Sequence, residues 1–97
     1  MEEVIYYNNL YDCYGILLTD KQKSYFESYY FENLSLSEIA DNYNVSRNAV
    51  YKQIQITLTK LKEYEDKLKL FEKKQLLSKI IEQEKDDKIK KDLEKLF

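Results

Sequence analysis

The sequence predicts an all-α protein, a helical bundle with a helix-turn-helix and a long C-terminal helical extension. The 97-residue chain has no Pro and one Gly, and Lys, Glu and Leu are abundant, which favours helices joined by short connections. Residues 35–46 carry the signals of a short capped helix, a tight turn and a second helix start. The segment that follows separates apolar from polar side chains. We expect a helix-turn-helix domain at residues 1–74 and a C-terminal helix at 75–97.

The first two helices are predicted from apolar spacing and capping residues. Apolar side chains recur at steps of three and four from about Glu2 to Ile16, which indicates an amphipathic helix whose last turn Gly15 should loosen. Thr19 or Asp20 is expected to cap a second helix that ends near Asn33. The expected buried face of this helix is aromatic and consists of Tyr25, Phe26, Tyr29 and Tyr30.

A short third helix follows almost at once. Ser35 and Glu38 form an S-x-x-E capping box, in which each side chain accepts a hydrogen bond from the backbone of the other residue. Asn44 is expected to adopt the left-handed conformation that closes this helix. Val45 should fill the gap between the two helices, and Ser46 should cap the next one. This order is that of a helix-turn-helix.

The helix that begins after Ser46 sorts its residues at 100° per residue. With Val50 at 0°, the stripe expected to be buried lies within about 80° and contains Ile54, Thr57, Leu58, Leu61, Tyr64, Glu65 and Leu68. Hydrogen-bonding side chains cluster on the opposite side, at about 140–200°, and these are Asn48, Lys52, Gln55 and Thr59. The alternative interpretation is an ordinary amphipathic helix with a solvated polar face.

The outer side of this helix is the candidate nucleic-acid surface. Asn, Gln, Arg and Lys side chains carry donors and acceptors that match base edges in a major groove, and Arg47 lies in the first turn, where a long side chain can swing outward. The predicted binding residues are Arg47, Asn48, Tyr51, Lys52, Gln55, Thr59, Lys60 and Lys62.

The helical pattern continues beyond this surface. The long helix is expected to reach about Lys73, which gives a length of about 40 Å. A fifth helix of about 20 residues should follow, with an apolar stripe that Glu84 and Lys88 interrupt. Because clean heptads are absent, a continuous coiled coil is less favoured than a helix that folds back or pairs with another chain.

Charge is distributed unevenly along the chain. Residues 1–45 contain two basic and eight acidic residues, a net charge of −6. Residues 46–74 contain eight basic and four acidic residues, a net of +4, and residues 75–97 contain six of each. Positive charge is therefore concentrated on the long helix, where a phosphate backbone would lie. The whole chain has a net charge of −2, so unaided binding to nucleic acid should be weak and salt-sensitive.

Composition also narrows the function. No apolar run approaches the 18 or so residues that a membrane span needs, and the N-terminus lacks the basic region of a signal peptide, so a soluble, cytoplasmic protein is expected. The single Cys13 fits a reducing compartment. With no His and one Cys, zinc sites and His-based catalysis are excluded. We therefore expect no enzyme activity, no cofactor and no metal.

Several blocks of the sequence resemble one family. They are L-L-T-D-K-Q at 17–22, the pair Tyr29–Tyr30, L-x-E-I-A at 36–40 and V-S-R-x-A-V-Y at 45–51. Together they resemble the bacterial YlxM-like family of small helix-turn-helix proteins, which is associated with the signal recognition particle and is similar to region 4 of sigma factors. The resemblance implies a cytoplasmic accessory protein that acts on that particle or its RNA.

Three functions remain open on this basis. The protein is an accessory factor that contacts the RNA, the protein component of the particle, or both. Alternatively, it is a DNA-binding transcriptional regulator whose Arg47, Asn48, Lys52 and Gln55 enter a major groove. The third possibility is a protein-interaction module without nucleic-acid binding, whose C-terminal helix pairs with a partner or with a second copy of the chain.

Overall fold

The computed structural model describes residues 2–97, and within them the protein is all-α, with no β-strand. The helices are α1 (Glu2–Tyr14), the short 3₁₀ helix η1 (Gly15–Leu17), α2 (Asp20–Tyr30), α3 (Leu36–Tyr43), α4 (Arg47–Leu68), α5 (Leu70–Gln83) and α6 (Asp87–Glu94). The predicted fold class is confirmed.

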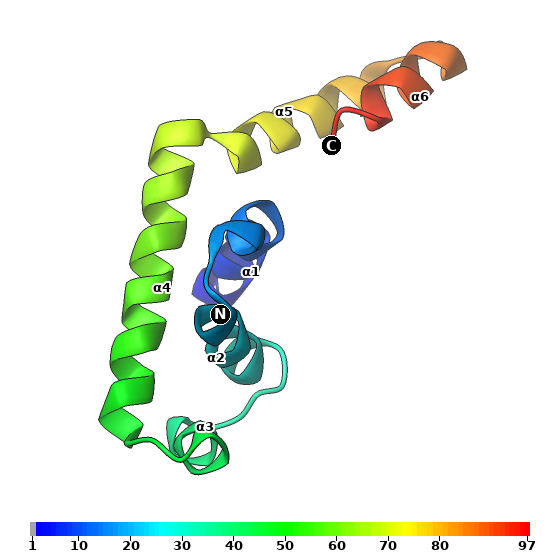
Figure 1. Cartoon of the computed structure of the whole chain (residues 1–97). Helices are drawn as coiled ribbons and strands as arrows, with labels where there is room; N and C mark the ends of the chain where they lie inside the picture. The colour runs from blue at the N-terminus through cyan, green and yellow to red at the C-terminus, as the bar shows by residue number, and fades with distance from the viewer. Residues whose placement is uncertain (1) are drawn as a thin grey trace.

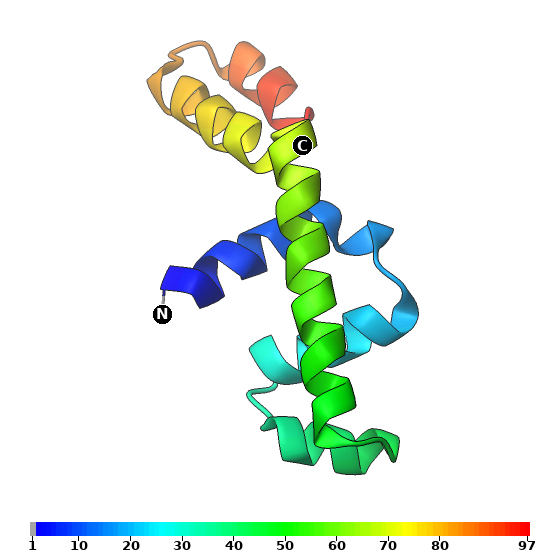
Figure 2. The same ribbon diagram turned by 90° about the vertical axis from the view of Figure 1, so that its left-hand side faces the viewer.

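The long helix α4 is the axis of the molecule. Helices α1, α2 and α3 all pack against the same side of α4 (Figure 1). In the second view, α4 runs in front of these three helices (Figure 2). At the C-terminal end of α4 the chain turns sharply, and α5 and α6 project beyond the bundle (Figure 1). The principal extents of 54 × 25 × 23 Å reflect this elongated shape.

Two buried clusters hold the bundle together. The first joins α1, the connection after it, the middle of α2 and the C-terminal half of α4 through Leu10, Tyr14, Leu18, Phe26 and Leu61. The second joins α2, α3 and the N-terminal half of α4 through Tyr25, Ile39, Ala40, Val50 and Ile54. Leu58 and Tyr30 contact both clusters, so the two form one continuous core.

The predicted aromatic face of α2 is only partly correct. Tyr25 and Phe26 are buried and Tyr30 is half-buried, but Tyr29 is 39% exposed. Tyr29 lies one turn beyond Tyr25 at nearly the same angle. Its side chain instead lines an open pocket between the end of α2 and the start of α3, beside Glu38.

The connection between α1 and α2 differs from the prediction at one helix end. The α-helix ends at Tyr14, and the chain tightens into a 3₁₀ turn at Gly15 where we expected a looser last turn. A Cβ atom at Gly15 would lie 3.2 Å from the ring of Tyr11, so the glycine allows this close approach. Thr19, and not Asp20, caps α2 through a reciprocal pair of hydrogen bonds with Gln22.

The expectation that the long helix reaches Lys73 is wrong. Helix α4 ends at Leu68 because Lys69 adopts a left-handed conformation with φ of 58°. Its 22 residues span about 33 Å. Leu68, predicted to be buried, is 45% exposed, whereas Glu65 in the same last turn is buried.

The single fifth helix predicted after Lys73 is instead two helices. The chain is non-helical at residues 84–86, where the Glu84 carboxylate accepts hydrogen bonds from the N–H groups of Lys85 and Asp86. Asp86 then caps α6 by accepting from the N–H groups of Lys88 and Ile89. Helix α6 folds back along α5 (Figure 1), so the two form a hairpin, which we call the α5–α6 hairpin.

Candidate nucleic-acid interface

The helix-turn-helix forms with the predicted capping geometry. The N–H of Ser35 donates to the Glu38 carboxylate at 3.1 Å, and the N–H of Glu38 donates to the Ser35 hydroxyl at 3.1 Å. Asn44 closes α3 with a φ of 54°. The Ser46 hydroxyl accepts from the N–H of Ala49 at 3.0 Å and starts α4. Each of these bonds satisfies a backbone group that the helix itself leaves free.

Val45 has a different role from the predicted one. Its side chain is 36% exposed and does not fill the space between the helices. The backbone N–H of Val45 donates to the carbonyl of Ala40 at 3.0 Å, which is the six-to-one bond of a Schellman motif. The turn is therefore fixed by its backbone, while Ile39 and Val50, both fully buried, hold α3 against α4.

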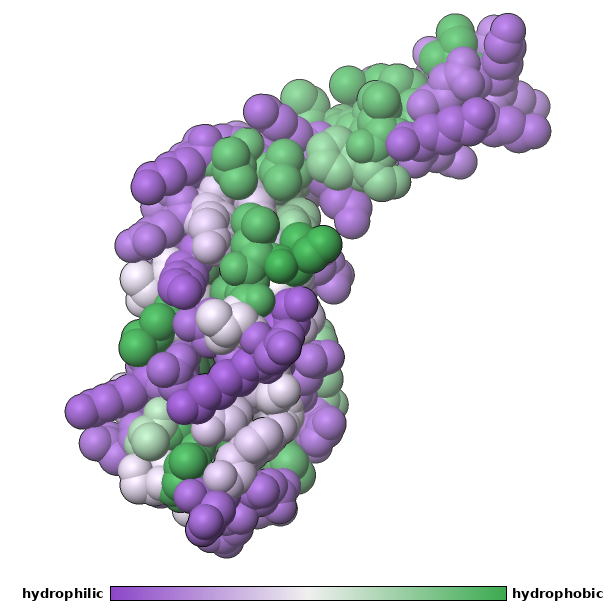
Figure 3. All heavy atoms as spheres, in the orientation of Figure 1, coloured by the Kyte–Doolittle hydropathy of each residue, from purple (hydrophilic) through white to green (hydrophobic). Residues whose placement is uncertain are grey.

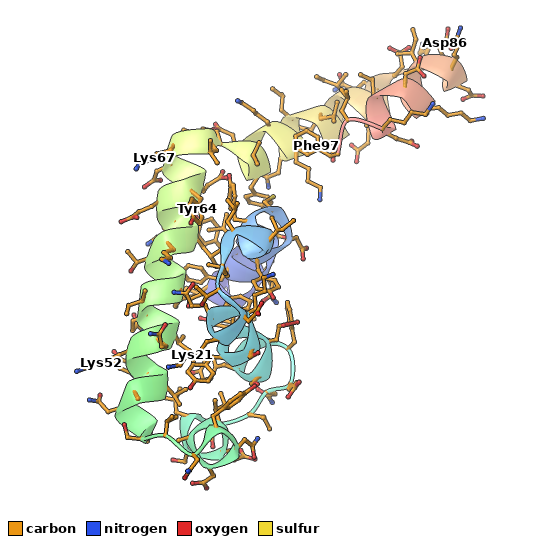
Figure 4. All side chains as sticks on the ribbon, viewed as in Figure 1. Lys21, Lys52, Tyr64, Lys67, Asp86 and Phe97 are labelled. Atoms are coloured by element: carbon orange, nitrogen blue, oxygen red, sulfur yellow. The ribbon has the colours of Figure 1, made fainter. Side chains whose placement is uncertain are left out.

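The two faces of α4 separate as the sequence predicted. Val50, Ile54 and Leu61 are at most 3% exposed. The opposite face is exposed at all four predicted positions, which are Asn48, Lys52, Gln55 and Thr59. The Lys52 side chain points away from the other helices (Figure 4). We call these four residues the outer face of α4.

The other predicted site residues do not all join this face. Arg47 and Tyr51 are exposed near the start of α4, and Tyr51 is 47% exposed. Lys62 extends the outer face toward the C-terminal end of the helix. Lys60 is half-buried and lies about 160° around the helix from Lys62. One flat partner therefore cannot contact both lysines.

The charges on α4 have no counter-ions in the described part of the chain. Among the described side chains, the one ion pair within 4.0 Å joins Lys95 and Asp92 in the C-terminal region. The ammonium groups of Lys52 and Lys62 are thus free to contact an external anion. Around the helix-turn-helix, at the bottom of the view, hydrophobic side chains are interspersed among hydrophilic ones (Figure 3).

A groove that the sequence analysis missed opens beside the outer face. It has a volume of about 370 Å³ and brings Tyr51 and Gln55 of α4 next to side chains from three other helices. The remaining lining residues are Glu3, Tyr7, Tyr29, Tyr30, Leu36, Ile54 and Leu58. Since these residues are up to 55 positions apart, no local pattern could have predicted the groove.

A buried polar cluster fixes the end of α4. The Tyr14 hydroxyl donates to the Glu65 carboxylate at 2.5 Å and accepts from the N–H of Leu70 at 2.9 Å. The same carboxylate accepts from the N–H groups of Phe71 at 3.0 Å and Glu72 at 3.2 Å. These residues therefore cap α5, and the negative charge lies favourably at its N-terminus. Burial, together with the bond to Glu65, raises the pKa of Tyr14 to about 12.

Other kinds of site find little support in the described part of the chain. Residues 2–97 contain no group of three or more His, Cys, Asp or Glu side chains placed to hold a metal ion. Burial raises the pKa of the half-buried Cys13 thiol, which favours the less nucleophilic protonated form. No helix among these residues is both long enough and apolar enough to cross a bilayer.

Comparisons with known proteins agree with this geometry. All 97 residues match the sequence model of the family UPF0122, described as "Putative helix-turn-helix protein, YlxM / p13 like". A UPF0122 protein of Geobacillus sp. (strain WCH70) is 49% identical over 86 residues, which cover 89% of this chain and 78% of that protein. A UPF0122 protein of Fusobacterium nucleatum subsp. nucleatum is 43% identical over 97 residues, or 100% of this chain and 94% of that protein.

Proposed function

This chain belongs to the UPF0122 family of YlxM- and p13-like helix-turn-helix proteins, and from that premise we propose that it is a nucleic-acid-binding, non-enzymatic accessory protein. It acts in the cytoplasm, in the signal recognition particle pathway, by contacting the RNA of the particle, its protein component, or both. The observation that carries the binding function is the exposed outer face of α4, which is held outward because Val50, Ile54 and Leu61 on the opposite face are at most 3% exposed.

Electrostatics support contact with a phosphate backbone. The segment 46–74 has a net charge of +4, whereas residues 1–45 have a net charge of −6. Within that segment, α4 itself (residues 47–68) carries five basic and three acidic residues, a net charge of +2, so a polyanion is attracted modestly to α4 and repelled by α1 to α3. Because few lysines lie on the outer face and its extension, binding involves few phosphates and weakens moderately with salt.

The geometry of nucleic-acid grooves separates RNA from DNA as targets. Duplex RNA has a deep, narrow major groove, so a helix would contact mainly its phosphates and 2′-hydroxyls. In duplex DNA, Asn48 and Gln55 can form paired hydrogen bonds with adenine, and Arg47 with guanine. The sorted polar residues at the start of α4 thus favour a second candidate function, that of a sequence-specific DNA-binding regulator. The proposed role in the signal recognition particle pathway, by contrast, depends on the likeness of this chain to YlxM-like proteins.

The test measures binding of the whole protein to the RNA of the signal recognition particle and to mixed-sequence duplex DNA. We expect Lys52→Ala to weaken binding about fivefold to tenfold and to lower the slope of log affinity against log salt by about 1. Lys88→Ala is the matched control, because it removes one exposed charge from α6 and leaves α4 intact. Equal affinities of Lys52→Ala and the parent protein at low salt would contradict nucleic-acid binding by α4.

Sequence dependence then decides between the two candidates. A similar loss on every duplex, with tighter binding to the particle RNA, supports the accessory factor. A loss restricted to one DNA sequence supports the regulator. If neither nucleic acid binds at low salt but the protein component of the particle does, the helix-turn-helix serves as a protein-interaction module.

A further inference from the structure

The α5–α6 hairpin leaves an apolar strip uncovered. Neither helix contains a buried residue. Leu76 is 59% exposed, Ile80 46% and Ile89 44%. Hydrophobic atoms gather on the projecting arm along α5 (Figure 3). We call Leu76, Ile80 and Ile89 the apolar strip.

The other sides of α5 are already occupied. Phe71 packs edge-on against the ring of Tyr6 in α1, with 6.4 Å between ring centroids. Leu77 and Ile81 are half-buried, and α6 packs along this part of the helix. Leu76 and Ile80 lie about 140° and 180° around α5 from Phe71. Leu76 and Ile80 therefore face away from the bundle, and Ile89 on α6 is likewise largely uncovered by the described part of the chain.

The net charge of the C-terminal region is compatible with a second copy of the hairpin as the partner that covers the strip. Residues 75–97 contain six basic and six acidic side chains, so this region is neutral and has no net attraction for a polyanion. A second copy of the same hairpin meets no net repulsion. Two-fold pairing places identical apolar strips against each other, and two antiparallel helix pairs form a four-helix bundle.

We propose that the α5–α6 hairpin is a dimerisation element that pairs with the hairpin of a second copy, with Leu76, Ile80 and Ile89 at the centre of a four-helix bundle. The hairpin projects beyond α1 to α4 (Figures 1 and 2), so the second hairpin can approach without meeting the helix-turn-helix. Each outer face of α4 stays free in the dimer. This proposal does not depend on nucleic-acid binding.

The test is the mass of the whole protein in solution, measured by light scattering or sedimentation without nucleic acid. We expect a mass near twice the 11.8 kDa of one chain at about 100 µM, with dissociation on dilution. In Leu76→Gln/Ile80→Gln, which changes no charge, the dimer dissociation constant should rise at least about 100-fold. Ile5→Gln/Ile16→Gln is the matched control, because these side chains are 66% and 83% exposed elsewhere; it should remain dimeric.

Amide hydrogen exchange of the unmodified protein gives a second readout that does not require a variant to fold. Protection of residues 76–93 should increase with protein concentration, whereas protection of α2 and α3 should not change. A monomeric mass at about 100 µM would overturn the proposal. So would a dimer whose mass is unaffected by Leu76→Gln/Ile80→Gln, or concentration-independent protection of the hairpin.

Discussion

Helix α4 and the α5–α6 hairpin have similar amphipathic sequences but very different burial. The apolar stripe of α4 meets α1, α2 and α3, and Val50 and Leu61 are completely buried. The hairpin has an apolar stripe as well, yet contains no buried residue. An amphipathic pattern therefore specifies which side of a helix seeks a partner. Whether a partner is present depends on the rest of the fold.

The largest expected effect tests the core side of this comparison. Phe26 is fully buried and stacks on Tyr11 and Tyr30, with ring centroids 4.4 and 4.5 Å apart. We expect Phe26→Ala to reduce the free energy of unfolding by about 3–5 kcal/mol, measured by urea denaturation. Ile16→Ala, at a site 83% exposed, should change it by less than about 0.5 kcal/mol. Similar losses for both variants would show that Phe26 is not part of a packed core.

A smaller effect is expected where the two regions meet. Glu65→Ala removes the carboxylate that caps α5 and leaves the buried Tyr14 hydroxyl without its acceptor. The expected loss is about 1–3 kcal/mol, with faster amide exchange at Phe71 and Glu72. The control Glu63→Ala removes an exposed carboxylate two residues before Glu65, on the other side of α4, and should leave exchange unchanged. Unaltered exchange in Glu65→Ala would mean that the carboxylate does not hold the hairpin.

The last effect on stability is absent at neutral pH and appears only in alkaline solution. Burial raises the pKa values of Tyr11, Tyr14 and Tyr30 to about 12, compared with about 10 in an unfolded chain. Between these values the unfolded chain loses protons that the folded one keeps, so stability falls as the pH rises from about 10 to 12. Residues 65–97 contain no Tyr, so this loss of stability arises in the bundle formed by α1 to α4.

Alkaline titration, followed by tyrosinate absorbance and circular dichroism, checks this pH dependence. Tyr14→Phe should shift the alkaline transition to higher pH, because it removes one of the buried ionisable groups. A transition centred near pH 10 in the parent protein, at the ordinary value for tyrosine, would contradict the burial of these hydroxyls.

The local features of this protein follow from short stretches of its sequence. The Ser35–Glu38 box, the left-handed Asn44 and the Ser46 cap were all predicted, because each rests on hydrogen bonds between residues at most five positions apart. The sorted faces of α4 followed from helical spacing alone. The Asp86 cap of α6 is equally local, so residues 86–89 carry a helix-start signal of the same kind.

The end of α4 and the groove beside its outer face depend instead on contacts between helices. The helix stops at Leu68 with no Gly or Pro nearby. It stops because Tyr14, 51 residues before Glu65, lies beside that carboxylate and together they cap the next helix. The groove at Tyr51 likewise needs four helices. Contacts between residues so distant in sequence depend on how whole helices pack, and no local pattern records them.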